Sequence, residues 1–453
     1  MVGELVIPES VTHIGAEVFF DCRNLSGHLK IPDSVTSMGR SSFSNCNAFS
    51  SLTLGKSLTK IPSGTFDHCS RIETVSGGEN IEIIDSLAFA NLTQLKEFKV
   101  EGKPIKKVDW YAFAGCKSLT SFPFKESLTE IGKRAFGGCS SLTGVLELPN
   151  SLTLLSDYAF ENCSGLTGIK FGDSLRGLGN YAFINCTGLT GDLILPPNLG
   201  SIGWGTFQGC KGLSGKLVFP NTMVHICNSA FKDCSGLTGD LIIPDGVRYI
   251  DENAFQNCSG FNGVLKLPKS LRCLDEFAFS GCSGLTGDLN LPPDIDFIGT
   301  EVFAGCVGLT GPVTIPASVQ RIDYGAFKNT AITEVLFEPD SKIRTIDGCF
   351  IGCSGLKKVS IPGTLSTFSI LNDAFNGCSS LTSLSLVGTL YKIQDKAESG
   401  CFEGCTSLRN IRFEDGESDL ALVTTRESLF GDCPLDSVYL GRNLTSDSNP
   451  FKG

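Results

Sequence analysis

The sequence predicts a right-handed, β-dominated solenoid in which one coil repeats along the chain. Phenylalanine followed three residues later by cysteine recurs at intervals of mostly 23 or 24 residues, and each interval holds the same order of apolar residues. A fixed period in this range is typical of leucine-rich-repeat solenoids. One coil cannot bury its own apolar residues, so we expect the coils to stack into one elongated body.

The stretch from Cys234 to Cys258 represents one coil. Leu237, Leu241 and Ile243 alternate with other residues, which predicts a short strand with one buried face. Pro244 ends this strand because proline donates no ladder hydrogen bond.

The second half of the same coil predicts a second extended run and a helical turn. Val247 and Ile250 form the extended run, and residues 251–255 are interpreted as a single helical turn with Asp251 as its cap. Phe255 and Cys258 are expected to point inward. Stacking then forms a parallel sheet, and parallel crossovers are right-handed in nearly all proteins.

These residues resemble the repeats of BspA-type bacterial surface proteins, whose consensus is L-x-x-I-x-I-P followed by I-G-x-x-A-F-x-x-C. The resemblance covers essentially the whole chain. It implies a leucine-rich-repeat fold, a location outside the cell and a role in adhesion or host-matrix interaction.

The repeat predicts a single solenoid over residues 1–453 with about 18 coils. Residues 22–135 are less regular, 139–330 are regular, and 350–453 carry longer loops near 366–372, 395–400 and 414–425. Both ends of the chain fall inside a coil and no signal peptide is present. We therefore expect a fragment of a longer protein.

An added glycine distinguishes most coils of 24 residues from the coils of 23. It occurs in eight coils, six of them consecutive between Leu189 and Val313. Because an extra glycine in a strand usually makes a bulge, the pattern predicts a stacked row of β-bulges.

Composition excludes several function classes. The 37 Lys and Arg against 48 Asp and Glu leave a net charge of −11, which argues against a nucleic-acid surface. No apolar run is long enough to cross a membrane. Catalytic signatures such as G-x-S-x-G or a phosphate-binding loop are missing, so we expect no enzyme and no cofactor.

The 20 cysteines predict a reduced, buried ladder rather than disulfides or a metal centre. All but Cys227, Cys273, Cys349 and Cys401 occupy the repeat position, which spreads them along a line, whereas zinc needs ligands that converge. Two coils have Leu92 and Thr330 there. A position that accepts leucine or threonine is a packing site.

The four histidines predict no site. His13, His28, His68 and His225 share no repeat position and lie far apart in the sequence. A metal ligand or general base needs partners within reach. We therefore interpret these histidines as scattered surface or edge residues.

The outward positions of the first strand suggest a partner surface. Three consecutive coils place Ile194, Val218 and Ile242 there, and the residues after the added glycine border them with charge: Asp192, Lys216 and Asp240. An apolar stripe with a charged rim is typical of an interaction site. The alternative is ordinary strand propensity, because isoleucine and valine favour strands.

Aromatic residues two or three positions before the core phenylalanine form a second candidate. Tyr158 and Tyr181 share one position in adjacent coils and should stack, and Trp204 follows one coil later. Exposed aromatic rows bind sugars or proteins. Partly buried packing between coils explains the same pattern.

Together these features favour a non-enzymatic extracellular binding scaffold for protein or glycan ligands, without nucleic-acid partners or membrane insertion. The alternative is a structural spacer or stalk that presents another domain at the cell surface.

Overall fold

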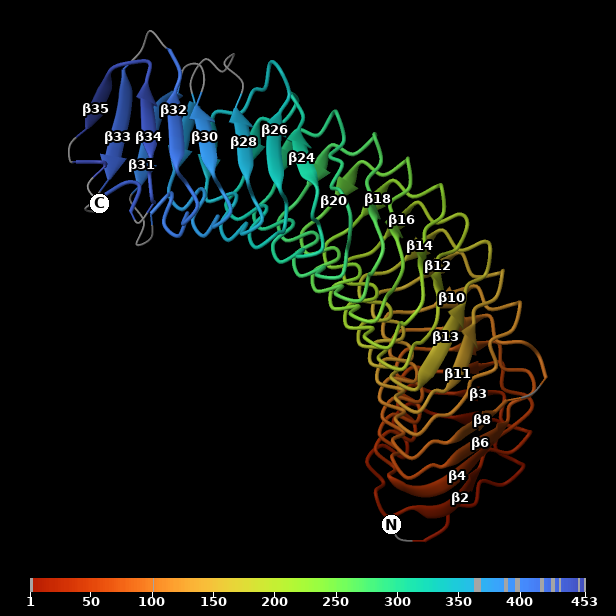
Figure 1. Cartoon of the computed structure of the whole chain (residues 1–453). Coiled ribbons are helices and arrows are strands. Elements are labelled where there is room, and N and C mark those ends of the chain that lie inside the picture. Colours follow the sequence, from red (N-terminus) through yellow and green to blue (C-terminus); the bar gives the residue numbers. More distant parts are fainter. Residues whose placement is uncertain are drawn as a thin grey trace. The chain divides into compact units, whose positions relative to one another are not determined.

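Stacked coils of parallel strands build the whole described chain (Figure 1). The computed structural model describes residues 3–100, 102–361, 368–386, 390–395, 400–415, 419–424, 428–431, 433–446 and 449–451. Its coils form two compact units, Met1–Thr222 and Met223–Gly453. Over these described ranges there is no helix, and hence none long and apolar enough to cross a membrane.

Most complete coils contribute one strand to a first ladder and one to a second, and the coils around residues 120–125 and 286–292 contribute a strand to the second ladder alone. In the first unit the first ladder consists of β2 (Ser26–Lys30), β4 (Ala48–Leu54), β6 (Thr74–Gly77), β8 (Glu97–Lys99), β11 (Gly144–Glu147), β13 (Leu166–Lys170), β15 (Leu193–Ile194) and β17 (Leu217–Val218). The second consists of β1 (His13–Ile14), β3 (Ser37–Met38), β5 (Lys60–Ile61), β7 (Ile83–Ile84), β9 (Lys107–Val108), β10 (Glu130–Ile131), β12 (Leu154–Leu155), β14 (Gly177–Leu178) and β16 (Ser201–Ile202).

The second unit repeats this plan. Its first ladder consists of β19 (Leu241–Ile242), β21 (Leu265–Lys266), β24 (Pro312–Ile315), β26 (Glu334–Phe337), β28 (Lys358–Ile361), β30 (Ser383–Leu386), β32 (Asn410–Phe413) and β34 (Ser437–Leu440). Its second consists of β18 (His225–Ile226), β20 (Tyr249–Ile250), β22 (Cys273–Leu274), β23 (Phe297–Ile298), β25 (Arg321–Ile322), β27 (Thr345–Asp347), β29 (Phe368–Leu371), β31 (Leu390–Asp395), β33 (Leu420–Thr424) and β35 (Leu444–Ser446). Figure 1 shows β24 to β34 of the first ladder side by side.

The core is a column of stacked phenylalanines with apolar strand residues around it. Phe255 is fully buried, and its ring centroid lies 5.3 Å from those of both Phe231 and Phe279. Leu241 and Ile250 of the two strands of that coil are also fully buried. The parallel pairing and the inward phenylalanine are therefore confirmed.

The segment that carries the core phenylalanine is not the helical turn that the sequence predicts. Asn253 and Asn257, two positions before and after Phe255, have φ of 58° and 61°. An α-helix needs an unbroken run of right-handed torsions, and a left-handed residue ends it. The same two positions are left-handed in other coils, for example at Tyr158 and Asn162, at Tyr181 and Asn185, and at Gly205 and Gly209.

Backbone hydrogen bonds explain this conformation. The amides of Phe255 and Asn257 donate to carbonyl oxygens of the next coil, those of Ala278 and Ser280, at 2.8 and 2.7 Å. The amide of Cys258 donates within its own turn, to the Phe255 carbonyl at 3.1 Å. Alternate amides thus serve the neighbouring coil and the local turn, which an α-helical segment could not do.

The predicted row of bulges is present only in part. The pairing register shifts between Gly27 and His28 in β2 and between Gly144 and Val145 in β11, as expected for bulges. Between residues 189 and 313 the added glycines alternate in conformation. Gly191, Gly239 and Gly287 are left-handed, with φ of 70°, 80° and 83°, whereas Gly215, Gly263 and Gly311 are not. The prediction of a continuous row of bulges is therefore wrong.

The alternation follows from the residue after the glycine. Between residues 189 and 313 each left-handed added glycine precedes an aspartate, and Asp240 Oδ1 accepts a hydrogen bond of 2.9 Å from the Val264 amide of the next coil. The same carboxylate lies where a side chain at Gly263 would have to be. The structural repeat in this region is thus a pair of coils.

The expected longer loops of 350–453 fall partly outside the described residues, which omit 362–367, 396–399, 416–418 and 425–427. The described strands on either side, such as β30 and β32, remain paired in register. Longer connections are therefore compatible with an unbroken first ladder, because loop length outside the sheet does not change the register.

Replacing Phe255 with alanine should remove a ring packed between two others and lower the free energy of unfolding by about 3–5 kcal/mol. Denaturant unfolding followed by circular dichroism measures the change. Val264→Ala in the same unit, at a side chain 48% exposed, is the control and should change it by less than about 0.5 kcal/mol. An unchanged midpoint for Phe255→Ala would contradict the stacked core.

Candidate functional site

The outer face of the first ladder exposes the predicted apolar residues. Ile194 is 61% exposed although the leucines on either side of it are 3% exposed, because side chains of a strand alternate between its two faces. Val218 is 43% and Ile242 51% exposed. The assignment of the strand faces is therefore confirmed, and a binding role for these residues stays a prediction.

The structure brings two of the three stripe residues together. Ile194 of β15 and Val218 of β17 are register partners in one parallel pair. Ile242 belongs to the second unit, where its register partner is Lys266. Ile194 and Val218, here called the apolar pair, are thus the directly paired part of the predicted stripe.

The aspartates of the charged rim also accept hydrogen bonds from backbone amides of the next coil. Asp192 Oδ1 accepts a hydrogen bond of 2.7 Å from the Lys216 amide, and Asp240 caps the next coil in the same way. Both aspartates and Lys216 are exposed. These backbone contacts fix the two carboxylates beside the apolar residues, which presents the negative charge in a constant place.

The aromatic row packs along the turn segments. The rings of Tyr158 and Tyr181 stack with centroids 5.0 Å apart and an interplanar angle of 20°, as predicted. The Arg134 guanidinium lies 4.7 Å from the Tyr158 centroid, within cation–π range. Both tyrosines are half-buried, whereas Trp204 is 56% exposed. The tyrosines therefore serve packing between coils, and Trp204 offers the free aromatic surface.

Sequence reasoning missed a shallow apolar hollow beside β11. Phe122, Pro123, Phe124 and Val145 are among its lining residues, and Val145 is 58% exposed. Residues 120–125 form no strand. Proline removes one ladder donor there. The missing strand, readable from the F-P-F sequence, interrupts the first ladder between β8 and β11.

The cysteine ladder has one hydrogen bond per coil. The Cys258 thiol donates to the Phe231 carbonyl oxygen of the preceding coil at 3.0 Å, and Cys139 donates to Phe113 at 3.2 Å. None of the 20 cysteines forms a disulfide. The thiols therefore pack and donate, as expected of a reduced ladder, and they bridge neighbouring coils through hydrogen bonds.

Burial keeps these thiols protonated. Desolvation of the charged thiolate raises the pKa of Cys139 and of Cys306 to about 12. A thiol that stays protonated is a poor nucleophile. The ladder is thus chemically inert near neutral pH.

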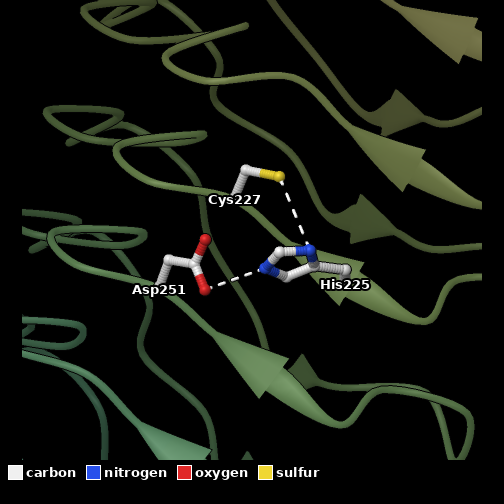
Figure 2. A group of neighbouring side chains, drawn as sticks. All are labelled: His225, Cys227 and Asp251. Carbon is white, nitrogen blue, oxygen red and sulfur yellow. Dashed lines mark hydrogen bonds and ion pairs between the residues drawn. The ribbon is translucent and has the colours of Figure 1, made fainter.

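One group of polar side chains, on the second ladder of the second unit, does converge. His225 opens β18, Cys227 follows the strand, and Asp251 follows β20 in the next coil. His225 Nε2 lies 2.8 Å from Asp251 Oδ1, and His225 Nδ1 lies 3.8 Å from the Cys227 sulfur (Figure 2). All three are partly exposed.

This trio corrects two expectations. The histidines were predicted to lack partners, which is wrong for His225, and Asp251 was predicted to cap its own turn, whereas its carboxylate binds the histidine of the preceding coil. The sequence does indicate that two of these residues are neighbours. Adding the 24-residue period to Cys227 gives Asp251, so the two residues must lie side by side in adjacent coils.

Comparison with known proteins assigns the family. A model of the BspA type leucine rich repeat region, in six copies, matches residues 2–119, 106–238, 238–347, 286–401 and 368–452. The chain belongs to the BspA-type leucine-rich repeat family. No curated protein matches this BspA-type chain.

Solved structures share the fold. A leucine-rich repeat protein from Bacteroides ovatus is 24% identical, with 85% of this chain and 86% of that chain covered and a TM-score of 0.50. A leucine rich cell surface protein from Faecalibacterium prausnitzii is 23% identical, with 92% and 87% covered and a TM-score of 0.30. The likeness to the Bacteroides ovatus protein shows the fold of the BspA-type chain.

The buried thiols of this BspA-type protein predict alkaline sensitivity. A ladder thiol has a pKa near 9.0 when exposed and about 12 in the folded chain, as for Cys139. Between these values the folded state holds a proton that the unfolded state has released. Each such thiol should therefore lower the free energy of unfolding by about 1.4 kcal/mol per pH unit as pH rises above 9, and have no effect below it.

Urea unfolding at a series of pH values, in the presence of a reductant, measures this slope. Cys139→Ala should reduce the slope above pH 9 by about one proton, and Val145→Ala in the same unit should leave it unchanged. An identical slope for Cys139→Ala and the wild-type chain would contradict the raised pKa.

Proposed function

We propose that this chain is a non-enzymatic binding scaffold that acts outside the cell, at a bacterial surface, and binds protein or glycan ligands on the outer face of its first ladder. The observation that carries the proposal is the apolar pair: Ile194 and Val218 are 61% and 43% exposed and lie in register. Membership of the BspA-type family supports the location.

The fold does not require an apolar side chain at these positions. The equivalent outward residues are Glu147 and Lys170 two and one coils earlier, and their charged groups lie 3.9 Å apart. Charged residues therefore form the same strand without loss of register. Isoleucine and valine favour strands, but leaving them exposed to water keeps their apolar area out of the core, and a complex that covers this area is stabilised by its burial.

The surroundings of the apolar pair suit an interface. Asp192 and Lys216 stand beside it, and the Asp192 carboxylate is fixed by its backbone contact. An apolar centre with a polar rim is the usual anatomy of a recognition surface. Fixed rim charges also lose little side-chain freedom when a ligand binds.

An array of glycans and extracellular-matrix proteins, probed with the purified chain, should identify ligands. For each ligand, Val218→Lys should weaken binding about tenfold or more, since a charge at the centre of an interface must be desolvated. The free energy of unfolding should change by less than about 0.5 kcal/mol, because the side chain is exposed.

The control places the same change on the other ladder. Leu154 of β12 is 64% exposed, and Leu154→Lys should leave both stability and binding unchanged. Unaltered binding by Val218→Lys and Ile194→Lys would show that this face is not the interface. A chain that binds nothing on the array would favour the structural spacer.

A further inference from the structure

We propose that His225, Cys227 and Asp251 form a binding site for one divalent transition-metal ion of the zinc type. These three residues are the one group of histidine, cysteine and acidic side chains among the described residues whose ligand atoms all lie within 4.8 Å of one another. The site is independent of the ligand face proposed above, because it lies on the second ladder of the second unit.

The donor set selects the class of metal. The atoms that face each other are the Cys227 sulfur and His225 Nδ1, and thiolate sulfur and imidazole nitrogen are both ligands that zinc binds in proteins. Asp251 supports the histidine from its other ring nitrogen. Calcium and magnesium take oxygen ligands, and here a carboxylate is the single oxygen-bearing side chain of the three. A borderline-soft ion such as Zn²⁺ or Co²⁺ therefore fits, whereas a hard ion does not.

The distances are close to those of a loaded site. His225 Nδ1 and the Cys227 sulfur are 3.8 Å apart. Two ligands at zinc bond lengths of ~2.3 and ~2.0 Å in a tetrahedral arrangement lie about 3.5 Å apart. A small rotation of partly exposed side chains brings the pair to that separation without moving the strand.

Asp251 prepares the histidine for this role. Its carboxylate oxygen accepts a hydrogen bond from Nε2–H at 2.8 Å (Figure 2), so in the neutral ring Nδ1 carries the lone pair and faces the sulfur. A carboxylate behind the imidazole orients a metal-bound histidine and raises its basicity. The negative charge of Asp251 attracts the ion as well.

The same three side chains resemble a nucleophile, base and orienting acid, and the geometry decides between the two interpretations. The 3.8 Å between His225 Nδ1 and the Cys227 sulfur is longer than the reach that a general base needs, whereas it is close to the separation of two ligands on one ion. A metal ion that binds the sulfur displaces its proton.

Titration of the metal-free, reduced full chain with Co²⁺ alone tests the site. We expect one ion per chain, a thiolate-to-cobalt charge-transfer band in the near ultraviolet and displacement by Zn²⁺. Cys227→Ser should abolish the band. His225→Ala should weaken binding by more than about 100-fold, and the isosteric Asp251→Asn by about 10- to 100-fold.

Cys273→Ser is the matched control, because Cys273 is a partly exposed cysteine on the same ladder and outside the trio. It should keep the band and the affinity. Zn²⁺ should also raise the melting temperature of the wild-type chain and of Cys273→Ser, and leave that of Cys227→Ser unchanged.

Two outcomes would overturn the proposal. One is a band or an affinity that survives in Cys227→Ser, which would place the ion elsewhere. The other is the absence of Co²⁺ binding together with unchanged melting in Zn²⁺. In that second case, alkylation of Cys227 by iodoacetamide much faster than that of Cys273 would assign the trio as a reactive thiol instead.

Discussion

Each coil depends on the next one for its hydrogen bonds. In the turn segments alternate backbone amides donate to the following coil, and the repeat-position thiol donates to the phenylalanine carbonyl of the preceding one. A buried polar group without a partner costs more than the bond itself contributes, so a coil detached from its neighbour would leave several such groups unsatisfied. Thr330 shows what the position requires: its hydroxyl donates to the Phe327 carbonyl of its own coil at 2.8 Å. Leu92 fills the same space without donating. Packing is therefore the common requirement at this position, and the hydrogen bond adds to it.

The sequence predicted the features that depend on periodicity alone. Strand alternation identified Leu241 as buried and Ile242 as exposed, and the repeat identified the phenylalanine column. The sequence did not predict the conformation between Asn253 and Asn257. Local propensity favoured a helical turn there, whereas the hydrogen bonds between coils decide the backbone conformation. Asparagine and glycine recur two positions after the core phenylalanine, and both tolerate left-handed torsions, so a signal was present. The bulge prediction failed at alternate glycines because the effect of an aspartate in one coil on the glycine of the next is a contact between coils.

The two candidate sites differ in the same way, because one follows from periodicity and the other from contacts between coils. The apolar pair was predictable because exposure on a strand follows from a period of two. The trio of His225, Cys227 and Asp251 was missed because each residue type was compared only with its own kind along the chain. In a solenoid the neighbours that matter are one period apart, whatever their type. Chemistry on such a scaffold is assembled from unlike residues in adjacent coils, and His225 with Asp251 is an example.

The pairing of coils limits how the gene of such a protein can lengthen or shorten. Loss of the two coils 237–284 by recombination between repeats would keep the alternation of coil types. The coil with Gly287 and Asp288 would then take the position of the coil with Gly239 and Asp240, which has the same glycine–aspartate sequence. Loss of coil 261–284 alone would lay two glycine–aspartate coils side by side. Asp288 would then occupy the place of Val264, whose amide the Asp240 carboxylate caps, and two like charges would face each other across the ladder. Variants that differ by an even number of coils should therefore be tolerated in this region, whereas odd numbers carry a defect at the junction.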